Sequence, residues 1–262
     1  MNHKKHPQRK SISIRVTIAI ILFSYGTWEQ YQEMYSDTIR PVEIRNVEKL
    51  RTCKKPQNGY MTFKCPNCAE KKYIPFSCKS RLCTSCGNKI VHKWSENIYN
   101  KLLDVTHRHI VLTIPTRLSK MIEGRADYLN ALIDAGKVTM EDMIKYSSPK
   151  KEKLKIGLIL VIQTYGGDLK YNVHLHGIVT EGGLNKRNNW VRTQFIKYAS
   201  WRKKWQYEVL TRLKKKMPKC KDTTLLIDEM FKKYPNGFVI YGKRRFRKSN
   251  ARSVIRYIGR YI

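Results

Sequence analysis

Short runs of apolar residues recur along the chain, and several of them end at a proline or shortly before a pair of glycines. The run at 109–114 ends at Pro115, and the runs at 158–164 and 173–180 each precede a Gly-Gly pair. Apolar runs of this length between turn residues predict buried strands, and the short loop between the second and third runs predicts an antiparallel hairpin. We expect a fourth strand at 238–241.

Helical spacing of apolar residues occupies much of the remaining sequence. Residues 116–147 have this pattern, with interruptions at Gly124 and Gly136. Further helices are expected at 94–102, 190–217, 225–234 and 251–256. Because strands and helices are segregated along the chain, the pattern predicts an α+β fold with a central antiparallel sheet flanked by helices.

The apolar stretch at 16–23 resembles part of a leader sequence. It is too short to cross a bilayer, and no small-residue cleavage site follows it. Acidic residues continue its helical pattern as far as Asp37, so we expect one soluble amphipathic helix, with membrane association as the alternative. We therefore expect no membrane partner and a cytoplasmic location.

The charge of the chain points to a polyanionic partner. There are 53 Lys and Arg residues against 20 Asp and Glu, a formal net charge of +33. The chain is 41% hydrophobic and 11% aromatic, which excludes a disordered basic tail. Self-repulsion of this size is tolerated most easily when phosphates neutralise it, so DNA or another nucleic acid is the expected partner.

More than half of the excess charge lies in residues 186–262, which hold 23 basic and 4 acidic residues, a net charge of +19. Aromatic residues are interspersed there, as in proteins that bind single strands by stacking. The alternative is that the charges are solvated helix faces and that Trp201 and Trp205 belong to the core. The candidate DNA contacts are Lys186, Arg187, Lys203, Lys204, Lys243, Arg244, Arg245 and Arg256.

Six of the seven cysteines lie between residues 53 and 86. Two Cys-x-x-Cys pairs predict one structural zinc ion, because each tight knuckle can direct two thiolates to the same tetrahedral ion. They are Cys65 with Cys68, and Cys83 with Cys86. The two remaining cysteines, Cys53 and Cys78, are either small buried residues or ligands of a second zinc ion with His92. A module with so few aliphatic residues does not fold easily without metal.

The strand at 173–180 contains His174-Leu175-His176, which places two imidazoles on one face of the strand. Such a pair can chelate one cation. Gln163, on the expected neighbouring strand, is either a third ligand or a residue facing water. His107-Arg108-His109 has the same spacing, but we interpret it as a coincidence because its charged middle residue would have to face the core.

Tyr257 and Tyr261 have helical i, i+4 spacing and would share one face of a helix, either as a functional pair or as packing. The motifs occur in a fixed order: paired Cys-x-x-Cys, H-I-V-L-T-I-P, T-Y-G, H-L-H followed by E-G-G-L, and Y-I-G-R-Y. From about residue 20 onward this order resembles the two-tyrosine HUH transposases of bacterial insertion sequences, of the insertion sequence ninety-one type.

The resemblance implies a zinc-binding domain at residues 1–105 and an HUH catalytic domain at 106–262. In that family a histidine pair with a third polar side chain holds a catalytic Mg²⁺ or Mn²⁺ ion against the scissile phosphate. Here these residues would be His174, His176 and Gln163.

The resemblance also implies that Tyr257 and Tyr261 cleave and rejoin single-stranded transposon ends and target DNA. Each cleavage leaves a 5′-phosphotyrosine and a free 3′-hydroxyl, as rolling-circle transposition requires.

The chain departs from the family pattern at Gln163 and Asn172, where histidines are common, and it ends one residue after Tyr261. We therefore expect a catalytic domain that is incomplete at its C-terminus. Two alternatives stay open: an inactive, truncated transposase that acts only as a zinc-dependent DNA-binding protein, or a replication initiator or relaxase.

Overall fold

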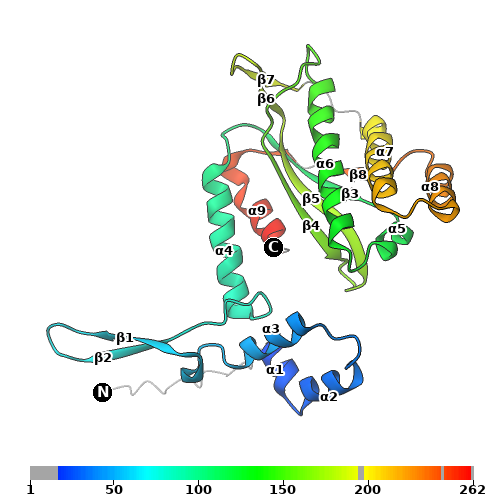
Figure 1. Ribbon diagram of the computed structural model, residues 1–262. Coiled ribbons are helices and arrows are strands. Elements are labelled where there is room, and N and C mark those ends of the chain that lie inside the picture. Colours follow the sequence, from blue (N-terminus) through cyan, green and yellow to red (C-terminus); the bar gives the residue numbers. More distant parts are fainter. Residues whose placement is uncertain (1–16, 194–197, 243–244, 261–262) are drawn as a thin grey trace, which may run out of the picture. The chain divides into compact units, whose positions relative to one another are not determined.

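The computed structural model divides the chain into two compact units, which meet between Lys93 and Trp94 (Figure 1). This division lies inside a helix, ahead of the expected boundary between residues 105 and 106. The structure describes residues 17–193, 198–242 and 245–260. Three candidate residues lie outside these ranges: Lys243, Arg244 and Tyr261.

The first unit combines short helices with a two-stranded ribbon. Its elements are α1 (Ile18–Phe23), α2 (Thr27–Met34), α3 (Pro41–Arg51), the 3-10 turn η1 (Pro56–Asn58), β1 (Tyr60–Lys64) and β2 (Lys71–Pro75). The single N-terminal helix expected from the sequence is wrong. The chain turns between α1 and α2 at Tyr25 and Gly26, whose φ angles of 58° and 69° are left-handed and end a right-handed helix. Trp28 of α2 is buried and donates its indole N–H to Glu48 of α3, which joins the two helices.

Helix α4 (Thr84–Lys101) begins in the first unit and continues into the second. The other elements of the second unit are β3 (His107–Thr113), α5 (Thr116–Met121), α6 (Ala126–Tyr146), β4 (Leu158–Tyr165), β5 (Tyr171–Thr180), β6 (Gly182–Leu184), β7 (Trp190–Arg192), α7 (Tyr198–Lys216), α8 (Lys221–Lys233), β8 (Ile240–Tyr241), β9 (Arg245–Phe246), the 3-10 turn η2 (Lys248–Asn250) and α9 (Arg252–Gly259). The four expected strands are present as β3, β4, β5 and β8.

The central sheet has five antiparallel strands in the order β4-β5-β3-β8, with β9 also paired to β3. The expected hairpin is the β4–β5 pair. Val111 of β3 and Val161 of β4 both lie opposite His176 of β5, and Gln163 lies opposite His174. This register places both histidines in the middle of the sheet and on the same face as Gln163. The expected α+β class is confirmed.

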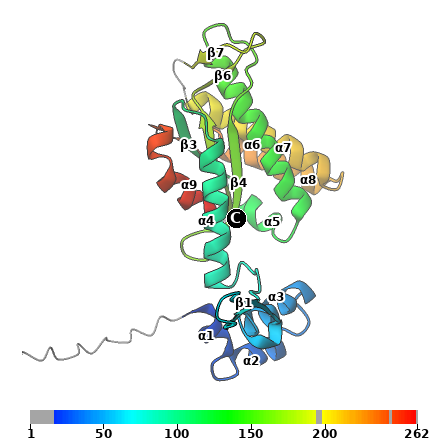
Figure 2. The ribbon, with the colours of Figure 1, turned by 90° about the vertical axis from the view of Figure 1, so that its left-hand side faces the viewer.

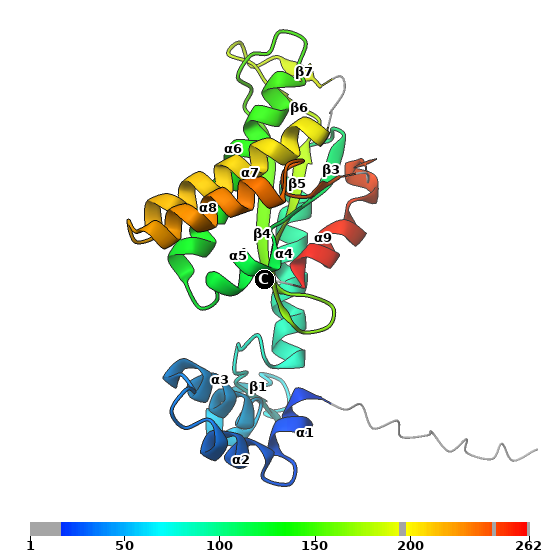
Figure 3. The ribbon, with the colours of Figure 1, turned by 90° about the vertical axis from the view of Figure 1, so that its right-hand side faces the viewer.

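One face of the sheet carries the larger hydrophobic core, covered by α6 and α7 (Figure 3). Helix α6 directs apolar residues inward at spacings of three and four, including Tyr128, Leu132 and Ala135. Gly136 does not interrupt this helix as expected, because it lies where α6 approaches the sheet. A Cβ there would be 2.8 Å from Cδ1 of Leu175.

The opposite face of the sheet packs against α9 and the second half of α4 (Figure 2). Val254, Ile255 and Ile258 are the buried face of α9, and they join Ile178 of β5 in a second apolar cluster. Trp94 and Ile98 of α4 pack against the same cluster, and Leu102, which follows α4, belongs to it. The histidine face of the sheet is therefore covered at one end by apolar side chains of two helices.

The helix expected at 190–217 begins later than predicted, because Trp190–Arg192 pairs with Gly182–Leu184 as the small β6–β7 ribbon. Trp205 of α7 is fully buried and donates its indole N–H to the backbone oxygen of Thr113, at 2.7 Å. The core interpretation is therefore correct for Trp205, and Trp201 also packs against the core. In the described part of the chain, no helix is long and apolar enough to cross a membrane.

Candidate functional site

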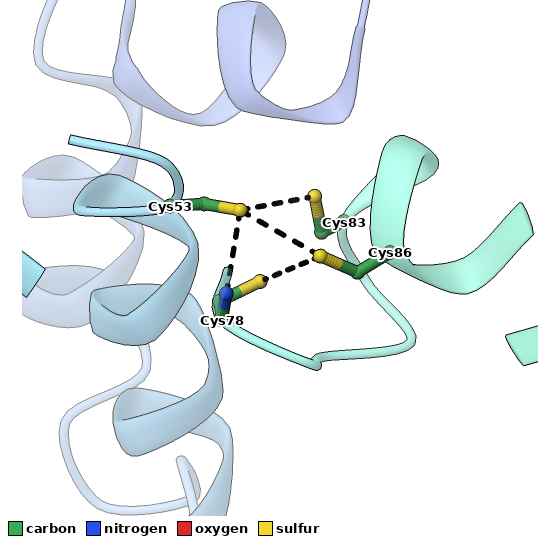
Figure 4. A group of neighbouring side chains, drawn as sticks. All are labelled: Cys53, Cys78, Cys83 and Cys86. Carbon is green, nitrogen blue, oxygen red and sulfur yellow. Dashed lines mark hydrogen bonds between the residues drawn. The ribbon is translucent and has the colours of Figure 1, made fainter. Parts of the chain in front are cut away.

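Four cysteine thiols of the first unit converge on one point (Figure 4). The Sγ atom of Cys53 is 3.6 Å from that of Cys83 and 3.7 Å from that of Cys86, and Cys78 is 3.7 Å from Cys86. A tetrahedral zinc ion with Zn–S bonds of about 2.3 Å separates its sulfur atoms by about 3.8 Å. The four thiols therefore fit one zinc ion with little movement.

Backbone amides and neighbouring thiols adjust the acidity of this cluster. The N–H of Cys78 donates to Cys53, and the N–H of Ser80 donates to Cys78, both at 3.4 Å. Burial opposes ionisation of Cys86, but hydrogen bonds from Cys53 and Cys78 outweigh it and lower the pKa of Cys86 to about 7. Burial raises the pKa of Cys78 to about 12. Metal binding would therefore have to displace the proton of Cys78.

The two Cys-x-x-Cys knuckles do not converge as expected: Cys83 and Cys86 belong to the four-thiol cluster, and Cys65 and Cys68 do not. Cys65 and Cys68 lie in the loop between β1 and β2, and no His, Asp or Glu of the described residues joins the four-thiol cluster, so His92 is not part of it. The β1–β2 ladder has five paired rows, which hold the loop about 17 Å from the open end of the ribbon. Cys53 and Cys78 flank that open end, where Lys54 N–H donates to Phe76 oxygen at 3.0 Å. The strand register therefore brings Cys53 and Cys78, in place of Cys65 and Cys68, to the Cys83–Cys86 knuckle.

The histidine pair of β5 lies beside Gln163 as the sheet register requires. Gln163 donates from Nε2 to the oxygen of Tyr165 at 2.8 Å, which turns its Oε1 atom toward His176. The Nε2 atom of His176 donates to this oxygen at 2.8 Å. His174 donates from Nδ1 to the oxygen of Asn172 at 2.8 Å, so its Nε2 atom keeps a lone pair.

This arrangement fits a small divalent ion. Two ligand atoms at right angles with bonds of about 2.1 Å lie about 3.0 Å apart, close to the separation of Gln163 Oε1 and His176 Nε2. The ring centres of His174 and His176 are 5.0 Å apart. Burial, and then the neighbouring His174 and His109, lower the pKa of His176 to about 4, so this ring is neutral at pH 7, as a ligand must be.

Helix α9 brings Tyr257 to the histidines. Its ring lies edge-on to His176, with centres 5.4 Å apart, and edge-on to His109, with centres 5.9 Å apart. Tyr257 is 40% exposed, so its ring is accessible to a substrate while its neighbour Ile258 is buried. Tyr261, the other expected nucleophile, lies outside the described residues.

His109 is a member of the site that the sequence analysis dismissed. Its Nε2 atom lies 3.3 Å from Nδ1 of His176. The charged residue beside it, Arg108, does face the other side of β3. Its Nε atom donates to the buried carboxylate of Glu181 at 2.7 Å, and its Nη1 atom donates to the backbone oxygen of Gly242. His107 does not reach the site; it stacks on Phe246.

The candidate DNA contacts differ in their exposure and in whether they form ion pairs within the protein. Lys204 is paired with Asp142 and Glu208, and Arg245 is paired with Glu181, so both side chains also make contacts within the protein. Five candidates are exposed: Lys186 and Arg187 in the β6–β7 turn, Lys203 on α7, Arg245 on β9 and Arg256 on α9.

Comparisons with known proteins place both units. Residues 25–114 match the transposase zinc-binding domain, and residues 157–262 match the family described as putative transposase. The chain is 31% identical over 173 residues to the "Transposase for insertion sequence element IS801" of Pseudomonas savastanoi pv. phaseolicola. It is 24% identical over 169 residues to the "Putative transposase y4qJ" of Sinorhizobium fredii.

These matches cover 65% and 64% of this chain, and the chain spans 41% of the length of each of these two relatives. No solved structure matches the chain significantly. The two domain families occur in the order of the two structural units. The unit that matches the zinc-binding domain contains the four converging thiols, which suit a zinc ion. The chain therefore belongs to the IS91-type insertion-sequence transposases, with an N-terminal zinc-binding domain.

Proposed function

We propose that this chain cleaves and rejoins single-stranded DNA through a 5′-phosphotyrosine intermediate, as an HUH-type enzyme of rolling-circle transposition. The observation that carries the proposal is the position of Tyr257, edge-on to His176 beside the Gln163–His176 hydrogen bond. A nucleophile, a histidine pair and an amide oxygen on rigid elements are the groups this chemistry needs within one site.

His174, His176 and Gln163 would hold the Mg²⁺ or Mn²⁺ ion, which supplies positive charge to the non-bridging oxygens of the scissile phosphate when it is bound. The residues themselves are preorganised. Asn172 fixes the His174 ring through its backbone oxygen, and the Tyr165 oxygen fixes the Gln163 amide. These contacts leave the Nε2 lone pair of His174 and the Oε1 lone pairs of Gln163 on the same face of the sheet.

Tyr257 is the proposed nucleophile of this face. Its phenolic oxygen attacks phosphorus, its proton leaves, the bond from phosphorus to the 3′-oxygen breaks, and that oxygen gains a proton. The new phosphotyrosine ester conserves the energy of the broken bond, so rejoining needs no ATP. Tyr261, four residues further along, is proposed as the second nucleophile from its spacing and the family resemblance.

Single-stranded transposon ends and target DNA are the proposed partners. Residues 186–262 carry a net charge of +19, and five of the candidate basic side chains there are exposed: Lys186, Arg187, Lys203, Arg245 and Arg256. Arg256 lies on the same helix as the proposed nucleophile, Tyr257. The zinc unit is proposed to contribute to DNA binding, and the cytoplasm is the proposed location.

A covalent-adduct assay tests this proposal. The full chain is incubated with Mn²⁺ and single-stranded oligonucleotides that cover the DNA flanking its own gene, and a protein–DNA band that survives denaturation is sought. Wild type and the control Tyr146→Phe, another exposed tyrosine, should form the band. Tyr257→Phe keeps the ring contacts and loses only the hydroxyl. The amount of covalent adduct should therefore fall to what Tyr261 alone can form, or lower.

Absence of an adduct from wild type, with DNA binding intact, would refute the nuclease proposal and favour the binding-only alternative. An adduct that forms on an origin-like hairpin but never on the ends of the element would favour a replication initiator or relaxase.

A further inference from the structure

The rings of His109 and His176 have a relative orientation that packing alone does not require. An imidazole nitrogen lies about 1.1 Å from its ring centre, so two coplanar rings whose nitrogens meet in line at 3.3 Å have centres about 5.5 Å apart. The observed centres are 5.5 Å apart, and the ring planes differ by 11°. The two rings therefore meet edge to edge through a linear hydrogen bond and are not stacked face to face.

The neighbouring groups fix the direction of this bond. The carboxamide oxygen of Gln163 can only accept, so Nε2 of His176 carries the proton that it donates. A neutral His176 then has no proton on Nδ1, and that atom accepts from Nε2–H of His109.

Use of His176 as a metal ligand requires the opposite arrangement. Its Nε2 atom must then offer a lone pair, so the ring proton of the neutral imidazole lies on Nδ1, which becomes a donor. Nε2 of His109 can accept this proton if His109 carries its own proton on Nδ1. Each ring holds one proton in both arrangements, and the exchange of positions passes through water.

We infer that His109 is a positioning residue, which holds the His176 ring in its ligating orientation by accepting a hydrogen bond from Nδ1. The inference rests on the proposed function, because it assigns His176 as a ligand. A histidine suits the position because one ring nitrogen serves as donor or acceptor, whereas lysine or arginine only donates and an ionised carboxylate only accepts. The edge contact of His109 with Tyr257 places the same ring beside the proposed nucleophile.

The register of the sheet makes this contact specific to one histidine of the pair. His109 lies opposite Ile178, one row of the same face away from the Val111–His176 pair. His107 lies two residues further along that face and stacks on Phe246 beside a cavity of about 230 Å³. His107→Phe is therefore a matched control: it makes the same change on the same strand face, with room for the larger ring.

Binding of Mn²⁺ to the full chain tests the inference without reference to activity. Wild type and His107→Phe should bind with equal affinity, and His109→Phe should bind about 10–100-fold more weakly. His109→Gln places an amide at a similar reach that can donate or accept, so it should recover most of the loss. Equal binding by His109→Phe and wild type, with binding lost in His174→Ala, would overturn the role of His109 and leave the proposed metal site intact.

Nitrogen-15 spectra of the histidine rings in the metal-free protein provide a second measurement. In wild type, His176 should show a protonated Nε2 and a hydrogen-bonded, unprotonated Nδ1, and His109→Phe should shift the Nδ1 resonance to that of a free acceptor. An unchanged His176 spectrum in His109→Phe would refute the hydrogen bond itself. If wild type binds no Mn²⁺ at all, the proposed function fails, and the spectra still decide whether His109 orients His176.

Discussion

Replacement of single cysteines by serine tests which thiols hold the zinc ion. Cys53→Ser removes one of four sulfur atoms that lie within 4.8 Å of one another, whereas Cys65→Ser changes a thiol in the β1–β2 loop. The two substitutions are chemically identical and lie in the same unit. We expect zinc to be lost from the first variant and retained by the second.

The size of the effect follows from the small core of this unit. Apart from two of the cysteines, the buried apolar side chains among its described residues are Trp28, Val47 and Leu50. Burial of each contributes about 1.5–3 kcal/mol, or about 5–9 kcal/mol together. A structural zinc site contributes about 10–16 kcal/mol in small zinc domains, so the metal is the larger contribution here.

Zinc content after dialysis against a competing chelator is the direct assay. Wild type and Cys65→Ser should retain one ion per chain, and Cys53→Ser should bind zinc more than about 100-fold more weakly, since loss of an outer partner alone costs 10–100-fold. Chelation should abolish the thermal transition of the first unit. Zinc lost from Cys65→Ser but retained by Cys53→Ser would refute the ligand set and restore the pairing of the two knuckles.

Three further predictions concern the second unit. Glu181→Gln leaves the guanidinium of Arg108 without its buried carboxylate, so the free energy of unfolding should fall by about 3–5 kcal/mol in urea titrations. Gly136→Ala should lower the free energy of unfolding by about 1–3 kcal/mol, because the new Cβ would lie 2.8 Å from Cδ1 of Leu175 and this overpacking exceeds the gain in helix propensity. A more stable variant would contradict the close approach of α6 to the sheet. Lys203→Ala should reduce the slope of log affinity for single-stranded DNA against log salt by about 0.7, while Lys204→Ala should leave the slope unchanged and lower stability; equal slopes for both would contradict the assignment of Lys203 as a phosphate contact.

Much of the second unit could be predicted from the sequence because its strands are long apolar runs bounded by proline and glycine. The β4–β5 hairpin and the central position of His174 and His176 follow from that pattern alone. The helix expected from residue 190 onward was wrong at its start. Trp190 and its neighbours pair with the Gly-Gly strand, and a short ribbon formed by tertiary pairing has no periodic signal of its own.

The zinc ligands could be predicted as a group but not individually. Spacing along the chain favours Cys65 and Cys68, since a knuckle is a local feature. The ribbon register instead brings Cys53 and Cys78 together across 25 residues. An alignment of β1 with β2 by their alternating residues would have been the signal for this pairing, although both faces of that ribbon are exposed and the pattern is weak.

From the sequence, His109 was excluded because the charged Arg108 beside it would have to face the core. Arg108 does point away from the histidine face, and an unpaired guanidinium there would be costly. Glu181, at the end of the neighbouring strand, is buried and pairs with it. The sequence contains both charges, but their separation of 73 residues conceals the pair until the sheet register is known.

The position of Tyr257 beside the histidines is the central claim, and the site of covalent attachment tests it most directly. Trypsin separates the two candidate nucleophiles, because Arg256 and Arg260 leave Tyr257 and Tyr261 in different peptides. After reaction with a single-stranded end and Mn²⁺, and nuclease trimming, mass spectrometry should find the nucleotide on the peptide 257–260. A nucleotide found on other peptides but never on 257–260 would contradict this claim for Tyr257.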